Sequence, residues 1–454
     1  MHIFEIIVPC HFGMEAVLKN EIIELGYDVS RVDDGRVTFK GDSEAVVRAN
    51  IFLRTAERVL IQAACFKAET FEELFEGTKA AQWEDFIPED GKFWVAKASS
   101  VRSKLFSPSD IQSIVKKAIV KRLGEHYGVS WFKEDGEAYP LRVFIKKDEV
   151  TIGLDTTGES LHKRGYRRFT AKAPIAENLA AGLLMLTPWK KDRVLIDPFC
   201  GSGTFPIEAA LMACNIAPGM NRSFTAEGWT NFIDKKLWYR ALDEANDLIA
   251  MPRALDIIGS DLDPEMIKTA RENAKLAGVA ELIRFEVKSA ADISHDGKYG
   301  FVVTNPPYGE RILEKEELPK LYSDFGKAFS LLDSWSAYII TSYENVERDM
   351  GLKASKNRKI YNGMMKTYFY QFIGPRPVDF KGNQAAFEIV PDKKPQGVRL
   401  AQKGELSGKR KFSANNNAKS VSRSDLKRDR GRDSMKVESK SQQTGRPKKR
   451  WTME

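Results

Sequence analysis

The sequence has few of the residues that cross-link small secreted domains or hold structural metals. It contains four cysteines and five histidines in 454 residues, and the cysteines form no CxxC pair. No two histidines stand four residues apart, the spacing that would place both on one helical face. These absences argue against a disulfide scaffold and a zinc framework. We therefore predict that the protein binds no metal and works in a reducing compartment, the cytoplasm.

Long hydrophobic runs are absent as well. The longest apolar stretch, residues 179–186, has eight residues, whereas a membrane span needs about 20. The opening segment MHIFEIIVPC lacks the basic region of a signal peptide, and Glu5 interrupts its apolar run. We expect neither a membrane partner nor a secretion signal.

Positive charge is concentrated near the C-terminus. The chain has 71 Lys/Arg and 63 Asp/Glu, a formal net charge of +8. Residues 391–454 hold 19 of the basic and 7 of the acidic residues, so the rest of the chain carries −4. This segment is rich in Ser, Asn and Gln and lacks apolar periodicity, which predicts a disordered basic tail. A polyanion can bind the remainder of the chain only through a local patch.

Before this tail, the pattern of predicted strands and helices divides the chain into two regions. Residues 1–60 read as strand, helix, strand and helix, and residues 61–155 continue in an α+β style around the amphipathic helix SPSDIQSIVKKAIVKRLG. From about residue 174 to 380, apolar strands alternate with helices, which predicts a doubly wound parallel sheet of the α/β class. The last part, KIYNGMMKTYFYQF, predicts a hairpin around Asn362-Gly363.

A glycine-rich turn follows the first apolar strand of this second region, in LIDPFCGSGTFPIEAAL. Asp197 ends the strand, a helix begins near Thr204, and Gly201 and Gly203 permit a ligand to approach the backbone closely. A dinucleotide fingerprint requires a third glycine where Pro206 stands, so NAD binding is disfavoured. The alternative is a tight turn with a purely structural role.

Acidic residues follow the next two strands. Asp261 ends the strand of DIIGSDLDPEM, where a carboxylate can accept hydrogen bonds from both ribose hydroxyls of an adenosyl ligand. Asp263 stands beside it and could instead cap the following helix. Asp292 follows IRFEVK and could accept a hydrogen bond from an adenine amino group, although a surface turn explains it equally simply.

The sharpest motif is Asn305-Pro306-Pro307-Tyr308, which follows an apolar strand directly. An exocyclic amine conjugated to a ring is a poor nucleophile because its lone pair is delocalised. The side-chain oxygen of Asn305 and the carbonyl of Pro306 could accept the two N–H groups of such an amine, while Tyr308 stacks on the flat substrate. Catalysis would then rest on positioning and electrostatics, and Cys200 in the glycine turn would only pack.

In this order, DPFCGSGT, Asp261 and NPPY resemble the class I S-adenosylmethionine-dependent amino-methyltransferases. The segments 157–184, 217–224 and 304–311 narrow the resemblance to the bacterial THUMP-domain RNA methyltransferases. These are similar to the N-terminal module of the large-subunit rRNA guanine-N2 methyltransferase. The resemblance covers about residues 1–385.

The resemblance implies a Rossmann-like class I methyltransferase domain at 156–385, preceded by an α+β region. That region would comprise a ferredoxin-like part at 1–60 and a THUMP RNA-binding domain at 45–155, with an overlapping boundary. It implies S-adenosyl-L-methionine as the cofactor, and large-subunit ribosomal RNA or its precursor particle as the partner. The residues that map onto cofactor contacts are Asp197, Gly201, Gly203, Thr204, Asp261 and Asp292. Those that map onto the catalytic loop are Asn305, Pro306 and Tyr308.

A basic linker, LHKRGYRRFTAK, joins the two expected regions. Its cations include Lys163, Arg164, Arg167 and Arg168, interleaved with aromatic residues, and it contains no acid. Arginine pairs with phosphate in a bidentate manner and aromatic rings stack on unpaired bases, so we predict RNA contacts here. The alternative is a brace between domains.

The leading hypothesis is methylation of the N2 amine of a guanosine in large-subunit ribosomal RNA. The runner-up is N6-adenine methylation of DNA or RNA, since NPPY serves both amines. Glutamine methylation uses the same logic, but the RNA-binding front half argues against it. A non-catalytic ribosome-assembly factor is the alternative from another class.

Overall fold

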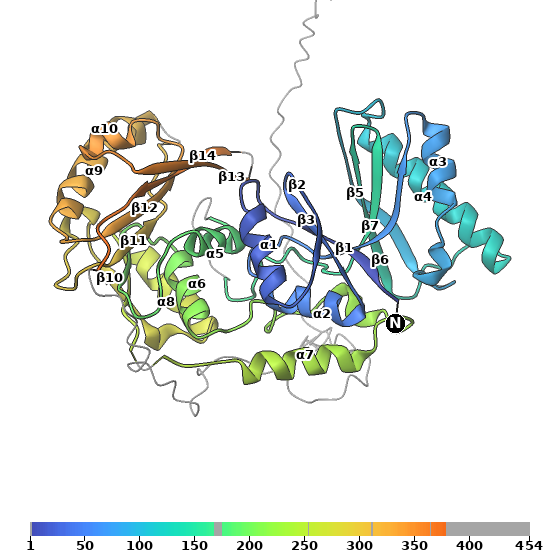
Figure 1. Cartoon of the computed structure of the whole chain (residues 1–454), viewed down its shortest axis with the longest axis horizontal. Helices are drawn as coiled ribbons and strands as arrows, with labels where there is room; N and C mark the ends of the chain where they lie inside the picture. The colour runs from blue at the N-terminus through green and yellow to red at the C-terminus, as the bar shows by residue number, and fades with distance from the viewer. Residues whose placement is uncertain (1, 168–174, 253, 310–311, 364, 378–454) are drawn as a thin grey trace, which may run out of the picture. The chain divides into compact units, whose positions relative to one another are not determined.

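The structure is a computed structural model of the chain (Figure 1), and it describes residues 2–167, 175–252, 254–309, 312–363 and 365–377. The predicted basic tail and Arg168 lie outside the described residues.

The first 155 residues build one seven-stranded sheet with the order β2-β3-β1-β4-β7-β6-β5. Strand β4 pairs with β1 at Ile61 and Ile6 and with β7 along its length, so the two α+β segments share a sheet. The strands are β1 (Phe4–Pro9), β2 (Val29–Asp33), β3 (Arg36–Gly41), β4 (Leu60–Lys67), β5 (Lys92–Val101), β6 (Ala138–Lys146) and β7 (Glu149–Asp155). The helices are α1 (Glu15–Glu24), α2 (Ser43–Phe52), α3 (Phe71–Lys79) and α4 (Pro108–Tyr127), the last being the predicted amphipathic helix.

The second sheet confirms the predicted doubly wound α/β fold, with the order β10-β9-β8-β11-β12-β14-β13. Its first five strands run parallel, and the predicted hairpin adds β14 and β13 in antiparallel pairing. The strands are β8 (Leu195–Asp197), β9 (Ile257–Asp261), β10 (Ile283–Val287), β11 (Phe301–Thr304), β12 (Ser336–Thr341), β13 (Lys356–Asn362) and β14 (Met365–Phe372). Strand order reverses at β8, between β9 and β11, which is where sheets of this kind leave a crevice for a ligand.

Six helices accompany this sheet among the described residues. They are α5 (Glu177–Met185), α6 (Thr204–Ala213), α7 (Lys235–Asp247), α8 (Pro264–Leu276), α9 (Ile312–Ser330) and α10 (Val346–Met350). Helix α7 belongs to the long insertion between the glycine turn and Asp261. Glu244 of α7 accepts two hydrogen bonds from Arg48 of α2, at 3.0 and 2.7 Å. Trp229, also in the insertion, donates to the Ala138 carbonyl of β6 at 2.8 Å and stacks on Tyr139. The insertion therefore packs against the N-terminal sheet.

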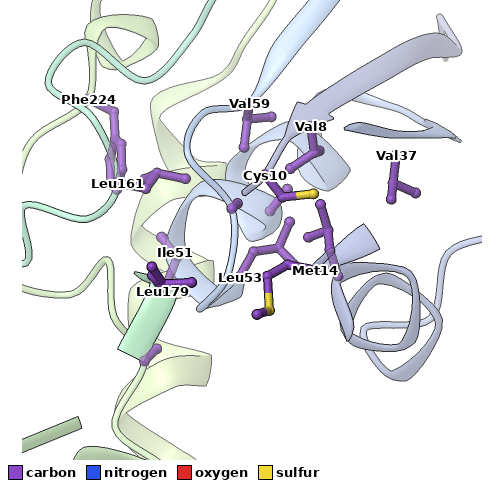
Figure 2. Packing of buried hydrophobic residues seen from close by; sticks show 14 of the residues in the cluster. Val8, Cys10, Met14, Val37, Ile51, Leu53, Val59, Leu161, Leu179 and Phe224 are labelled. Atoms are coloured by element: carbon purple, nitrogen blue, oxygen red, sulfur yellow. The ribbon is translucent and has the colours of Figure 1, made fainter. Parts of the chain in front are cut away.

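One hydrophobic core runs from the N-terminal region into the second sheet. Figure 2 shows Met14 and Leu53 of the first region in one cluster with Leu161 of the basic linker and Leu179 of α5. A second core covers the other face of the second sheet, where Tyr322 and Phe325 of α9 meet Ile339 of β12. No helix in the part of the chain that the structure describes is long and apolar enough to span a membrane.

Candidate active site

A cleft of about 1100 Å³ lies at the carboxyl ends of the central parallel strands. It is lined by residues 197–202 after β8, 261–263 after β9, 289–291 after β10 and 305–308 after β11. The fold thus brings the glycine turn, the acidic strand end and the NPPY loop to one space. Among the residues that the structure describes, no group of three or more metal-ligating side chains is found there or elsewhere.

The two glycines of the turn have different reasons to be glycine. Gly201 has φ +49°, and a Cβ built on it would meet nothing within 4 Å, so its side faces the open cleft. Gly203 has φ +86° and begins α6, and a Cβ there would lie 3.1 Å from the Cβ of Ala270. Gly201 therefore fits close approach by a ligand. Gly203 serves the packing of α6 on α8, although we predicted ligand approach for both.

Asp197 is buried at the end of β8. Its Oδ1 accepts hydrogen bonds from the Thr304 hydroxyl at 2.6 Å and from the Phe199 amide at 3.2 Å. Burial, together with the neighbouring charge of Asp261, raises the pKa of this carboxyl to about 7. A cationic ligand group near this carboxyl would stabilise its charged form, because opposite charges attract.

Asp261 closes the same turn from the next strand. Its Oδ2 accepts from the Gly201 amide at 3.0 Å and its Oδ1 from the Asp263 amide at 3.0 Å. These contacts fix a partly exposed carboxylate at the cleft. Asp263 accepts from the Glu265 amide at 2.9 Å, so it caps α8. Between them Leu262, 73% exposed, lines the cleft, and the sequence analysis missed it.

Asp292 stands apart from the other predicted cofactor residues. It is exposed in a single 3-10 turn after β10, and the cleft wall is formed by its neighbours 289–291. Its contact with the adenine ring stays a prediction.

The NPPY loop forms another part of the cleft wall. The Tyr308 hydroxyl donates a short hydrogen bond to Oδ1 of Asn305, which fixes the orientation of the amide. A carbonyl-type oxygen has two lone pairs, so Oδ1 keeps capacity for a second donor.

Two further elements complete the cleft, and sequence reasoning missed both. Lys320 and Asp324 of α9 line it, as do Asn362 and Met365 at the turn of the β13–β14 hairpin. The hairpin itself was predicted, but its distance from the other motifs in sequence gave no sign that it reaches the site.

The basic linker divides its cations between surface and interior. Lys163 is exposed, with Nζ 3.5 Å from Glu159. Arg164 is 4% exposed, donates to the carbonyls of Leu161 and Arg54, and lies 3.6 Å from Glu208 of α6. These partners hold the guanidinium in the protein interior, which favours a bracing role for Arg164, and its contact with RNA stays a prediction.

Arg167 is also held by the protein. It lies 3.2 Å from Glu177 and donates to the Ile175 carbonyl at 3.0 Å and to the Thr204 hydroxyl at 2.7 Å. Thr204 begins α6, so Arg167 links the linker to the glycine turn. The brace alternative therefore fits Arg164 and Arg167, while the prediction for Arg168 lies outside the described residues.

Comparison with known proteins gives the family. Three family models match consecutive parts of the chain: "RlmL ferredoxin-like domain" at 5–60, "THUMP domain" at 68–155 and "RMKL-like, methyltransferase domain" at 164–371. YpsC of Bacillus subtilis (strain 168) is 47% identical over 371 residues, which are 81% of this chain and 96% of YpsC. The ribosomal RNA large subunit methyltransferase K/L of Marinomonas sp. (strain MWYL1) is 33% identical over 82% of this chain. The match covers 53% of that relative, so the chain spans about half its length.

Solved structures agree with this assignment. The crystal structure of a possible methylase from Clostridium difficile 630 is 50% identical with a TM-score of 0.80, covering 83% of this chain and 99% of that one. The crystal structure of SMU.472 complexed with SAH is 41% identical with a TM-score of 0.78, covering 83% and 100%. The chain therefore belongs to the THUMP-containing methyltransferases with an RMKL-like catalytic domain.

Proposed function

We propose that this protein methylates the N2 amine of a guanosine in large-subunit ribosomal RNA. As a member of its family the chain is a methyltransferase, and S-adenosyl-L-methionine is its methyl donor. The observation that carries the proposal is the meeting of the glycine turn and the NPPY loop in one cleft, joined by the bond from Thr304 to Asp197. The similarity to the ribosomal RNA large subunit methyltransferase K/L supports the choice of ribosomal RNA.

The cleft has the chemistry that the donor requires. The free side of Gly201 leaves room for a ligand against the backbone, and Asp261 is held at the mouth by two amides. We assign the ribose hydroxyls to Asp261 and the cationic methionine part to the neighbourhood of Asp197. When bound, the donor supplies an electrophilic methyl group on a sulfonium sulfur.

The NPPY loop would prepare the acceptor. Asn305 Oδ1 and the Pro306 carbonyl are proposed to accept the two N–H groups of the amine, which localises the nitrogen lone pair and directs it at the methyl carbon. The amine nitrogen would bond to the methyl carbon as the bond of that carbon to sulfur breaks, which would release S-adenosyl-L-homocysteine, and the nitrogen would then lose one proton to water. Tyr308 holds the Asn305 amide in place and offers its ring to the purine. No covalent intermediate on the protein is needed.

The THUMP match favours RNA over DNA as the substrate. The proposal includes both naked ribosomal RNA and its precursor particle as acceptors. A cytoplasmic location also belongs to it, and the four free cysteines of the structure agree with a reducing compartment.

The experiment is transfer of a labelled methyl group from S-adenosyl-L-methionine to undermodified ribosomal RNA and, separately, to unmethylated DNA, followed by digestion to nucleosides. We expect label in N2-methylguanosine from RNA alone. The matched control is Asn305→Ala, which should bind the cofactor normally and transfer no label. Label in N6-methyladenosine would overturn the guanine assignment. If Asn305→Ala still rescued a ribosome-assembly defect in cells, binding rather than catalysis would be the essential role.

A further inference from the structure

The β13–β14 hairpin carries a regular arrangement of lysines and tyrosines on one face. In its register Lys359 stands opposite Tyr368, and Tyr361 stands opposite Lys366. Residues paired across an antiparallel ladder share a face, so these four side chains form a two-by-two checkerboard. The Lys359 ammonium lies 5.0 Å from the centre of the Tyr361 ring, and that of Lys366 lies 4.9 Å from the centre of the Tyr368 ring.

The opposite face of the hairpin is committed to the core. Ile360, Thr367 and Phe369 are fully buried there. Both lysines of the checkerboard are exposed and both tyrosines are half-buried, so this face is available to a partner.

The hairpin is also the most basic part of the second sheet in sequence. Residues 353–366 hold five Lys/Arg and no Asp/Glu, in a chain whose first 390 residues carry a net negative charge. The contact with Tyr368 raises the pKa of Lys366, and the charge of Glu344 raises it to a smaller extent. Lysines on an edge strand such as β13 also discourage pairing with other chains. That role explains exposed lysines, but not their placement over tyrosine rings.

The turn of the hairpin reaches the active cleft at the end of the ladder, where the cleft-lining residues lie on the face of Ile360 and Thr367. Asn362 and Met365, which pair at the end of the ladder, line the cleft that holds the NPPY loop. On the other side, Phe12 packs edge-on against Tyr361 at 6.1 Å between ring centres, and Arg358 donates to the Gly13 carbonyl at 3.4 Å. Phe12 is 53% exposed, so an aromatic ledge continues from the hairpin onto the N-terminal region.

From this juxtaposition we propose that the checkerboard face binds the unpaired RNA strand that flanks the target nucleotide. Each nucleotide offers a base for a tyrosine ring and a phosphate for the neighbouring ammonium. Asn362 and Met365 then border the target base as it enters the cleft. The inference rests on the proposed function for its substrate class, and it assigns to that substrate a surface outside the linker and the THUMP domain.

The test is the affinity of the full chain for a short labelled single-stranded RNA over a series of salt concentrations. In Lys359→Gln/Lys366→Gln we expect weaker binding, and a slope of log affinity against log salt that is shallower by about 1.4, since each phosphate contact on a single strand contributes about 0.7. Lys268→Gln/Lys275→Gln, two exposed lysines of α8, makes the same change in net charge and should leave the slope as in the wild type.

A second pair of variants tests stacking separately from charge. Tyr361→Ala should weaken RNA binding at least about fivefold, because stacking of a base on a ring has an effect of this order. Tyr361→Phe keeps the ring and should bind as the wild type does. All variants should keep their thermal midpoint and cofactor affinity, which separates loss of contact from loss of fold.

The two proposals fail differently. If hairpin and control variants bind RNA equally while the wild type makes N2-methylguanosine, the hairpin proposal is overturned and the proposed function stands. If the hairpin variants lose RNA affinity but the wild type labels another nucleoside, the hairpin surface stands and the guanine assignment falls. A rise in KM for RNA with kcat nearly unchanged is the kinetic signature expected of the hairpin variants.

Discussion

Thr304 donates a 2.6 Å hydrogen bond to Asp197, and this contact joins the two working halves of the cleft. Asp197 ends the strand before the glycine turn, and Thr304 ends the strand before the NPPY loop. The two strands are neighbours in the sheet although 107 residues separate the pair in sequence. A change at one end of this bond should therefore affect both the proposed cofactor site and the proposed acceptor site.

Replacing Thr304 by valine keeps the volume and removes the hydroxyl. We expect cofactor affinity to fall about tenfold, since a hydrogen bond to a charged group contributes about 1.5–3 kcal/mol. Isothermal titration with S-adenosyl-L-homocysteine measures this. Thr341→Val is the matched control, because Thr341 ends the adjacent strand β12 and bonds to Tyr322 at 3.0 Å, away from the cleft. Equal affinities in the two variants would contradict the role given to the Thr304 hydroxyl.

The raised pKa of Asp197 predicts a pH dependence of stability. Burial raises the pKa to about 7 in the folded protein, above its ordinary value, so the folded state binds this proton more tightly than the unfolded state does. Asp197 thus contributes stability at low pH that is lost as pH rises through about 7. Urea unfolding of the ligand-free protein measures this. The free energy of unfolding of Asp197→Asn, relative to that of the wild type, should rise from about pH 4 to pH 7 and then level off. Parallel profiles for wild type and variant would show that the carboxyl is not perturbed.

The bond from Tyr308 to Asn305 predicts separable effects on catalysis. Tyr308→Phe keeps the ring and releases the amide, so we expect kcat to fall about tenfold, the loss of one orienting hydrogen bond, with KM for RNA nearly unchanged. Tyr308→Ala also removes the stacking surface and should raise KM. Steady-state kinetics over a range of RNA concentrations give both quantities. If Tyr308→Phe were as active as the wild type, the hydroxyl would have no positioning role.

The two glycines of the turn predict opposite failures. Gly203→Ala places a Cβ 3.1 Å from Ala270 at φ +86° and should lower the free energy of unfolding by more than about 1 kcal/mol. Gly201→Ala shares the backbone strain of a positive φ, at +49°, but meets no atom within 4 Å, so the effect that distinguishes it should be weaker cofactor binding. Chemical denaturation and cofactor titration of both variants distinguish the cases. Loss of cofactor affinity without loss of stability in Gly203→Ala would contradict the packing role.

The sequence predicted the second sheet well because its parallel strands are buried on both faces and read as short apolar runs between helices. It also predicted the hairpin, because Asn362-Gly363 is a strong turn signal. It could not predict that the hairpin turn lines the cleft. Strand β14 inserts between β12 and β13, and this order depends on pairing between strands rather than on local pattern.

In the linker, the sequence could not show which basic side chains are exposed and which are buried. Lys163 and Arg164 are adjacent and both basic, so from the sequence we predicted RNA contacts for both. The structure exposes the first and buries the second, because Arg164 has a partner in Glu208 on a helix that follows much later in the chain. Tyr166 donates to the same Glu208 at 3.0 Å, so the linker anchors two side chains on α6.

The different surroundings of Arg164 and Lys163 give a prediction in which the Lys163 variant is the control for the Arg164 variant. Arg164→Met removes the cation that lies 3.6 Å from the fully buried carboxylate of Glu208 and leaves Arg54 as a second cation acting on it. The change should lower the free energy of unfolding by about 3–5 kcal/mol. Lys163→Met should change stability by less than about 0.5 kcal/mol, as surface substitutions usually do. If Lys163 contacts RNA, the same variant should lower the salt slope of RNA binding by about 0.7. Urea unfolding and RNA titration of both variants give the full comparison.

The opposite result would favour the RNA contact. If Arg164→Met kept the stability of the wild type and bound RNA more weakly, Arg164 would be an RNA-binding residue rather than a brace. Since Glu208 lies one turn beyond Thr204 on α6, loss of the brace should also weaken cofactor binding, and Lys163→Met should not.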